Sequence, residues 1–97
     1  MEVRIQAIHF EASERLVAFI EKKAARLERH NPAITLVDVT LKVVKPETAL
    51  NKQAIISVTS PGHDNLVADK TADTFEEAVD LALEALSRQL EKLKEKK

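Results

Sequence analysis

The sequence has no cysteine, tryptophan or tyrosine, and it contains one glycine and three phenylalanines among 97 residues. Without cysteine there is no disulfide, thiolate metal site or cysteine nucleophile. One glycine does not build a glycine-rich phosphate loop, and few aromatic rings argue against a platform for stacked bases. The chain also lacks an apolar run long enough to span a bilayer and a signal-peptide pattern at its N-terminus. We therefore expect a cytoplasmic protein with no membrane contact, cofactor, metal or small-molecule substrate.

The composition is that of one soluble globular domain, with 44% hydrophobic and 32% charged residues. A net charge of −1 argues, taken alone, against nucleic-acid binding. The charges are segregated, however: residues 64–84 contain seven acids and one lysine, whereas residues 85–97 contain five basic residues and two acids. The distribution of charge therefore carries more information than its sum.

Hydrophobic periodicity predicts four strands and two helices. Alternation of apolar and polar residues predicts strands over residues 2–10, 36–44, 53–60 and 65–71. Apolar stripes at helical spacing predict helices over residues 13–29 and from 74 to near the C-terminus. Residues 45–52 are expected to form a loop and residues 61–64 a turn.

Capping residues mark the expected helix starts. Ser13 is a favourable N-cap for the first helix. The second helix has two alternative capping boxes, Asp73 with Glu76 or Thr74 with Glu77.

The order β-α-β-β-β-α limits the topology. A crossover through a helix predicts that the first two strands are adjacent, parallel and connected right-handedly, and the later strands follow as a meander. Each helix has one apolar stripe, and the sheet offers one apolar face. The expected fold class is therefore α+β, with a four-stranded sheet, two helices side by side on one face, and the other face in solvent.

The first helix sorts its charges. At about 100° per residue, its basic residues fall in a sector roughly 60° wide; they are Arg15, Lys22, Arg26 and Arg29. A different stripe holds its acids, Glu14, Glu21 and Glu28. Mixed charges would instead form salt bridges between residues four apart. A row of cations suits a polyanion, of which RNA is the most plausible; the alternative is an ordinary solvated face.

The second helix carries further cations. Arg88 and Lys92 are four residues apart and opposite the leucine face, so they extend the basic surface if the helix edges meet. The lysines of residues 92–97 either contact RNA or only solubilise the chain end and favour the helix dipole. Without aromatic platforms, RNA binding must act through phosphate and shape, which makes it strongly salt-dependent.

Acids and histidines raise a second hypothesis. A carboxylate stripe on the second helix consists of Glu76, Asp80 and Glu84. Such a stripe suits catalysis, a metal or a basic protein, but acids near a helix N-terminus are more often solvated and stabilised by the dipole. The histidines, His9, His30 and His63, lie in different predicted elements without metal-ligand spacing. A small metal-dependent enzyme is therefore the less favoured alternative.

Several short segments resemble a known family. They are residues 25–28, residues 41–43 with Lys45, residues 73–75 with residues 78–80, and residues 87–90 with Lys92. In this order and spacing the chain resembles the ribosome hibernation-promoting factor family, in the short form that includes the ribosome-associated inhibitor. The resemblance covers essentially the whole chain. It implies a βαβββα fold akin to a double-stranded-RNA-binding domain with an extra strand.

The resemblance also implies a function. The family is non-enzymatic and binds small-subunit ribosomal RNA between head and body, overlapping the tRNA and mRNA sites, so it blocks initiation and protects idle ribosomes in starved or stationary cells. Its basic positions map to Lys23, Arg26, Arg29, Arg88 and Lys92, although Lys23 lies at the border of the apolar face. Ala85 stands where the family has a lysine, which removes one phosphate contact. The full set of candidate RNA-binding residues is Arg15, Lys22, Lys23, Arg26, Arg29, Lys42, Lys45, Arg88 and Lys92.

Two expectations concern partners. Because the sequence ends just after the second predicted helix, we expect a short form without the C-terminal domain through which long-form relatives pair two ribosomes. If it promotes ribosome dimers, we expect it to need a second hibernation factor, and we expect the free protein to be a monomer. A general double-stranded-RNA-binding module is the rival interpretation.

Overall fold

The computed structural model describes residues 1–44 and 50–95. Its elements follow the predicted order βαβββα. They are β1 (Glu2–Ala7), α1 (Glu14–His30), β2 (Leu36–Val43), β3 (Lys52–Thr59), β4 (Leu66–Ala72) and α2 (Phe75–Glu95).

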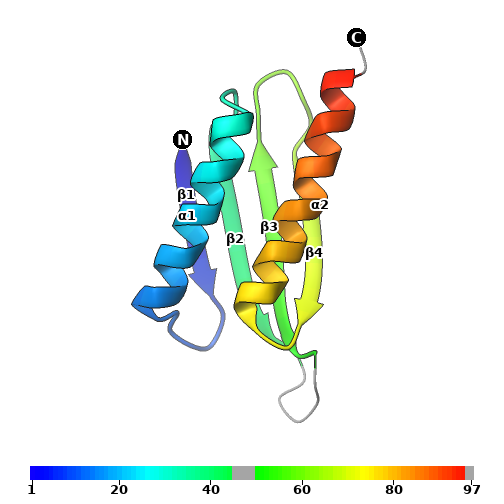
Figure 1. The fold of residues 1–97 in the computed structure, drawn as a ribbon. Helices are drawn as coiled ribbons and strands as arrows, with labels where there is room; N and C mark the ends of the chain where they lie inside the picture. Colours follow the sequence, from blue (N-terminus) through cyan, green and yellow to red (C-terminus); the bar gives the residue numbers. More distant parts are fainter. Residues whose placement is uncertain (45–49, 96–97) are drawn as a thin grey trace.

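The four strands form one sheet in the order β1-β2-β3-β4 (Figure 1). β1 and β2 are parallel, and the other neighbouring pairs are antiparallel. In this register Val39 of β2 lies between Ile5 of β1 and Ile56 of β3, so apolar side chains of neighbouring strands share one face. The predicted parallel crossover and meander are confirmed.

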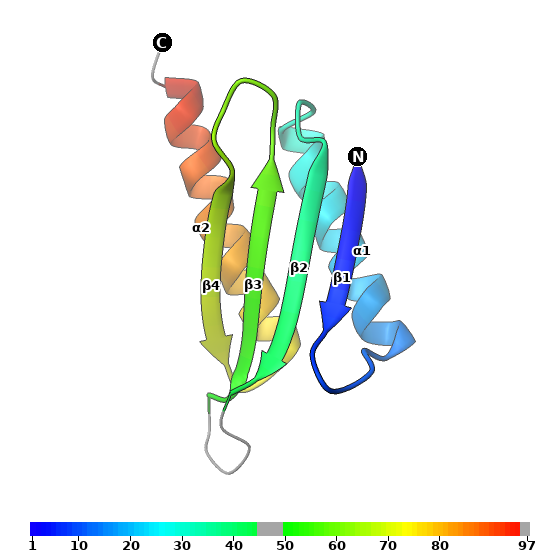
Figure 2. The same ribbon diagram turned by 180° about the vertical axis from the view of Figure 1, so that it is seen from behind.

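Both helices pack on this apolar face, and the opposite face of the sheet is left uncovered (Figure 2). The core combines one stripe from each helix with alternate residues of the strands. Its largest fully buried side chains are Ile20, Leu41, Ile56, Leu86, Val37, Val39, Val58 and Val79. Burying each such side chain stabilises the fold by about 1.5–3 kcal/mol. This packing fixes which side of each helix faces solvent.

Side-chain caps set the ends of the helices. The Ser13 hydroxyl accepts a hydrogen bond from the backbone N–H of Leu16 at 3.1 Å, as predicted. At α2, the Thr74 hydroxyl accepts from the backbone N–H of Glu77 at 3.1 Å, which favours the second of the two proposed capping boxes. Asp73 has another partner, because its carboxylate accepts from the backbone N–H of Leu50 at 2.8 Å.

The predicted end of the first strand was wrong, and the other predicted boundaries of strands and helices differ from the structure by at most one residue. The first strand ends at Ala7 rather than at residue 10, because His9 has a left-handed φ of 65° and turns the chain. This turn brings Phe10 onto the ring of Phe75, with ring centroids 5.0 Å apart. The third strand begins at Lys52, within the expected loop over residues 45–52; residues 45–49 of that loop lie outside the described residues.

Neither helix of the described chain is long and apolar enough to cross a membrane.

Candidate nucleic-acid interface

The sorted cations of α1 form its outer surface. The buried stripe of this helix is Leu16, Ile20, Ala24 and Leu27. Because that stripe is fixed against the sheet, the opposite side is held in solvent, and it carries Arg15, Lys22, Arg26 and Arg29, all exposed. None of these four forms an ion pair with another residue that the structure describes. We call these four residues the α1 basic row.

Two of the three acids of α1, Glu21 and Glu28, lie toward β1 instead. The Glu28 carboxylate is 3.5 Å from the amino group of Met1, at the start of β1. Glu21 lines a hollow together with Val3, Ile5 and Glu11. This helix therefore has an acidic side next to the edge strand β1 and a basic side that faces solvent and α2.

Lys23 is separate from the α1 basic row. Its ammonium group lies 3.2 Å from a carboxylate oxygen of Asp80 on α2 and 5.5 Å from the centroid of the Phe19 ring. Only 29% of its side chain is exposed. The expectation that Lys23 lies at the border of the apolar face is met, and its charge is already partnered.

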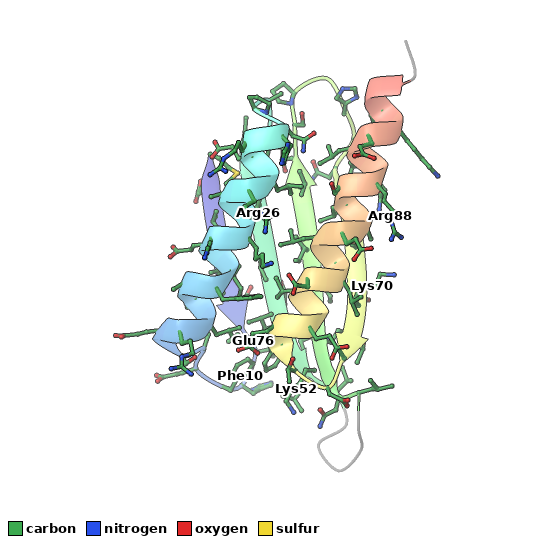
Figure 3. The ribbon with its side chains drawn as sticks, in the orientation of Figure 1. Phe10, Arg26, Lys52, Lys70, Glu76 and Arg88 are labelled. Atoms are coloured by element: carbon green, nitrogen blue, oxygen red, sulfur yellow. The ribbon has the colours of Figure 1, made fainter. Side chains whose placement is uncertain are left out.

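The two candidate RNA-binding cations of α2 differ in their surroundings. Arg88 pairs with Glu84, one turn earlier on the same helix, and points away from α1 toward the outer side of the molecule (Figure 3). Lys92 is exposed and has no ion-pair partner among the described side chains of residues 1–44 and 50–93. At about 100° per residue, Lys92 lies on the same outer side of α2 as Arg88.

A groove runs between the two helices and is lined by opposite charges. The residues that line it are Lys23, Arg26, Leu27 and His30 of α1 and Asp80, Leu83, Glu84 and Ser87 of α2. The α1 basic row therefore does not continue directly onto Arg88, because the carboxylates of Asp80 and Glu84 lie between them.

The candidate residues of β2 lie elsewhere. Lys42 is exposed, and it follows the buried Leu41 in the strand, so it projects from the sheet face opposite the helices. It cannot share one flat contact surface with the α1 basic row. Lys45 lies outside the described residues.

The same open face carries Arg4 of β1. Its Nε donates a hydrogen bond of 2.8 Å to Glu2, and this bond raises the pKa of Arg4. Arg4 is thus a cation paired with Glu2 on the side of the molecule away from the helices.

Lys70 is a further exposed cation to which the sequence patterns did not point. Lys70 of β4 occupies an inward-facing position between Ala68 and Ala72, which are both buried, yet it is exposed because β4 is an edge strand. Lys70 and Arg88 lie on the same outer side of the molecule (Figure 3). A cation at an inward position of a strand is the signal that could have identified it.

The acids and histidines show no metal-site arrangement in the described parts of the chain. No three or more His, Asp or Glu side chains there are grouped so that they could hold a metal ion. Asp80 and Glu84 of the carboxylate stripe are instead engaged with Lys23 and Arg88.

The fold and its charged helix layer define a class of small α+β domains whose exposed cations suit a polyanion. Residues 3–97 match the family described as sigma 54 modulation protein / S30EA ribosomal protein. Relatives named ribosome hibernation promoting factor, from Pseudomonas putida and Azotobacter vinelandii, are each 34% identical over 96 residues. These matches cover 99% of this chain and 89% and 85% of the two relatives. The chain therefore belongs to the sigma 54 modulation protein / S30EA ribosomal protein family, and its resemblance to hibernation-promoting factors is confirmed.

Solved structures agree on the fold. A ribosomal subunit interface protein from Coxiella burnetii superimposes with a TM-score of 0.86 at 25% identity, covering 99% of this chain and all of that chain. The N-terminal domain of Protein Y from Thermus thermophilus gives a TM-score of 0.80 at 22% identity, covering 96% of this chain and 99% of that one. The predicted α+β class is thus confirmed.

Proposed function

We propose that this protein is a ribosome hibernation factor. It acts in the cytoplasm without catalysing a reaction, binds ribosomal RNA of the small subunit, and keeps idle ribosomes from starting translation. Family membership and the names of its relatives support the association with ribosomes. The proposed RNA-binding surface rests on one observation: the four cations of the α1 basic row are exposed and form no ion pair with another described residue.

The α1 basic row fits a phosphate backbone for two physical reasons. From Arg15 to Arg29 it extends about 21 Å along a rigid helix, at about 1.5 Å per residue, so several phosphates fall within its reach. Arginine forms paired hydrogen bonds with phosphate oxygens, and three of the four cations are arginines. Contacts of this kind position a protein on RNA without reading base sequence, so they suit a fixed site on a large folded RNA.

Translation is then inhibited by steric exclusion rather than by a catalysed reaction. The folded chain measures 46 × 23 × 18 Å along its principal axes. A body of this size, held by its helix layer in the channel between the head and body of the small subunit, excludes tRNA and mRNA. Lys92 and Lys70, on the outer side of α2 and β4, supply contacts to a second stretch of backbone.

A general double-stranded-RNA module is the second candidate, because two neighbouring helices carry exposed cations. The carboxylates in the groove between the helices weigh against it. A single duplex lying across both helices would bring its phosphates close to Asp80 and Glu84.

A gradient profile of ribosomes with added protein tests the proposal. We expect the protein to sediment with small subunits and whole ribosomes, and initiation in a purified translation system to fall as protein is added. The same profile reports whether ribosome dimers form. Protein that stays at the top of the gradient at physiological salt, with initiation unaffected, would contradict the proposal.

A further inference from the structure

Two carboxylates of α2 lie in the groove beside the α1 basic row. Asp80 and Glu84 are four residues apart, so they share one side of the helix, and both line the groove together with Lys23 and Arg26. Asp80 is 3.2 Å from the ammonium group of Lys23, and Glu84 pairs with Arg88. Two candidate phosphate-binding cations are thereby engaged within the protein itself.

These ion pairs compete with RNA. Lys23 or Arg88 can bind a phosphate only by loosening its hold on a carboxylate. Arg88 and Glu84 are well exposed, with 71% and 58% of their side chains in solvent, and Lys23 and Asp80 are partly exposed at 29% and 50%. Ion pairs in such positions are weak, so a phosphate can displace them. The released carboxylate then faces the phosphate backbone, and like charges repel. Electrostatic repulsion therefore weakens the binding of RNA that crosses the groove, whereas RNA that lies along α1 does not face these carboxylates.

We propose that Asp80 and Glu84 are specificity-determining residues, which weaken binding to RNA in general while leaving binding to the ribosomal site nearly intact. This inference rests on the proposed function. The two acids engage Lys23 and Arg88, and they place negative charge between the α1 basic row and the outer side of α2. The two acids thus reduce non-specific binding of the α1 basic row to duplex RNA.

Matched variants test this role. Asp80→Asn with Glu84→Gln removes the two groove carboxylates. Glu11→Gln with Glu21→Gln removes two exposed carboxylates from the hollow beside β1, on the acidic side of α1. Both double variants raise the net charge by the same two units. For the parent and both double variants, the dissociation constant is measured with two ligands at one salt concentration. The ligands are a naked A-form RNA duplex of about 20 base pairs and isolated small subunits.

The groove variant is expected to bind the naked duplex about tenfold more tightly than the parent, while the control changes by less than about threefold. Binding of both variants to small subunits is expected to change by less than about threefold, so the preference for ribosomes falls only in the groove variant. Equal gains in the two variants, or no gain in the groove variant, would overturn the inference.

The two proposals fail in distinguishable ways. If the parent protein does not bind small subunits, the proposed function fails, but the duplex comparison between groove and control variants still decides the electrostatic role of Asp80 and Glu84. If small subunits are bound and the groove variant gains nothing on duplex RNA, only the inference fails. Should the double variant unfold, Glu84→Gln alone, compared with Glu21→Gln alone, gives the same test at matched net charge, because Glu84 and Glu21 are both exposed.

Discussion

Lys23 of α1 and Asp80 of α2 meet across the groove between the helices, with 3.2 Å between ammonium nitrogen and carboxylate oxygen. The contact joins two elements that are far apart in sequence, and it divides the cations of α1 into two groups. Lys23 belongs to the interface between the helices, whereas the α1 basic row remains open to solvent. The proposed RNA-binding surface on α1 therefore consists of the α1 basic row without Lys23.

The Lys23–Asp80 pair is expected to contribute little stability. Substituting Lys23→Met keeps most of the aliphatic stem over Phe19 but removes the charge, and we expect the free energy of unfolding to fall by at most about 1 kcal/mol. A double-mutant cycle with Asp80→Asn, followed by urea denaturation, measures the coupling directly. A coupling above about 3 kcal/mol would show a structural role that this exposed geometry does not support.

Two leucines of α2 give a test of the core. Leu86 is fully buried, and Leu86→Ala is expected to lower the free energy of unfolding by about 2–5 kcal/mol, because it leaves a cavity. Leu81 is 40% exposed, and Leu81→Ala is expected to cost less than about 1 kcal/mol. Chemical denaturation of both variants makes the comparison. Similar losses at the two positions would mean that α2 is rotated relative to the sheet.

The start of α2 can be tested at adjacent residues. Thr74→Ala removes the hydroxyl that accepts from the Glu77 backbone N–H, and is expected to destabilise the fold by about 1 kcal/mol. Thr74→Ser retains the hydroxyl and is expected to restore most of this loss. Thermal unfolding monitored by circular dichroism measures both. A loss that serine does not recover would point to the threonine methyl group rather than the cap.

Salt dependence reports the number of phosphate contacts. For the parent protein, the logarithm of the affinity for small subunits is expected to fall linearly with the logarithm of the salt concentration. Removing two contacts with Arg26→Ala and Arg29→Ala is expected to reduce the steepness by about 1.4–1.8. Arg4→Ala, on the open face of the sheet, serves as the control with unchanged slope. An unchanged slope in the double variant would exclude these two arginines from the interface.

Most of the fold follows from local pattern. Val37, Val39 and Leu41 alternate with polar residues, and that alternation is enough to place β2 and its buried face. The crossover rule then gives the parallel pairing of β1 with β2. The early end of β1 is different, because it depends on the left-handed conformation of His9, which hydrophobic periodicity does not report.

The candidate site was predictable only within single elements. The angular positions of Arg15, Lys22, Arg26 and Arg29 come from helix periodicity, so their shared exposed face was evident from the sequence. The rotation of α2 relative to α1 is set by tertiary packing, which sequence periodicity does not supply. For that reason the pairing of Lys23 with Asp80 and the carboxylates beside the α1 basic row became evident only in the structure.

Charge reversal on α1 tests the central claim most directly. Arg26→Glu with Arg29→Glu places two carboxylates in the α1 basic row, whereas Arg4→Glu reverses an exposed arginine on the opposite face of the sheet. Arg26→Glu alone is matched to Arg4→Glu in net charge. Circular dichroism first establishes that each variant is folded, and co-sedimentation with small subunits at physiological salt then measures binding.

We predict that the Arg26/Arg29 double variant no longer sediments with small subunits. Arg26→Glu alone is expected to bind at least about tenfold more weakly than the parent, whereas Arg4→Glu binds within about twofold of it. Undiminished co-sedimentation of a folded Arg26/Arg29 double variant would contradict this prediction.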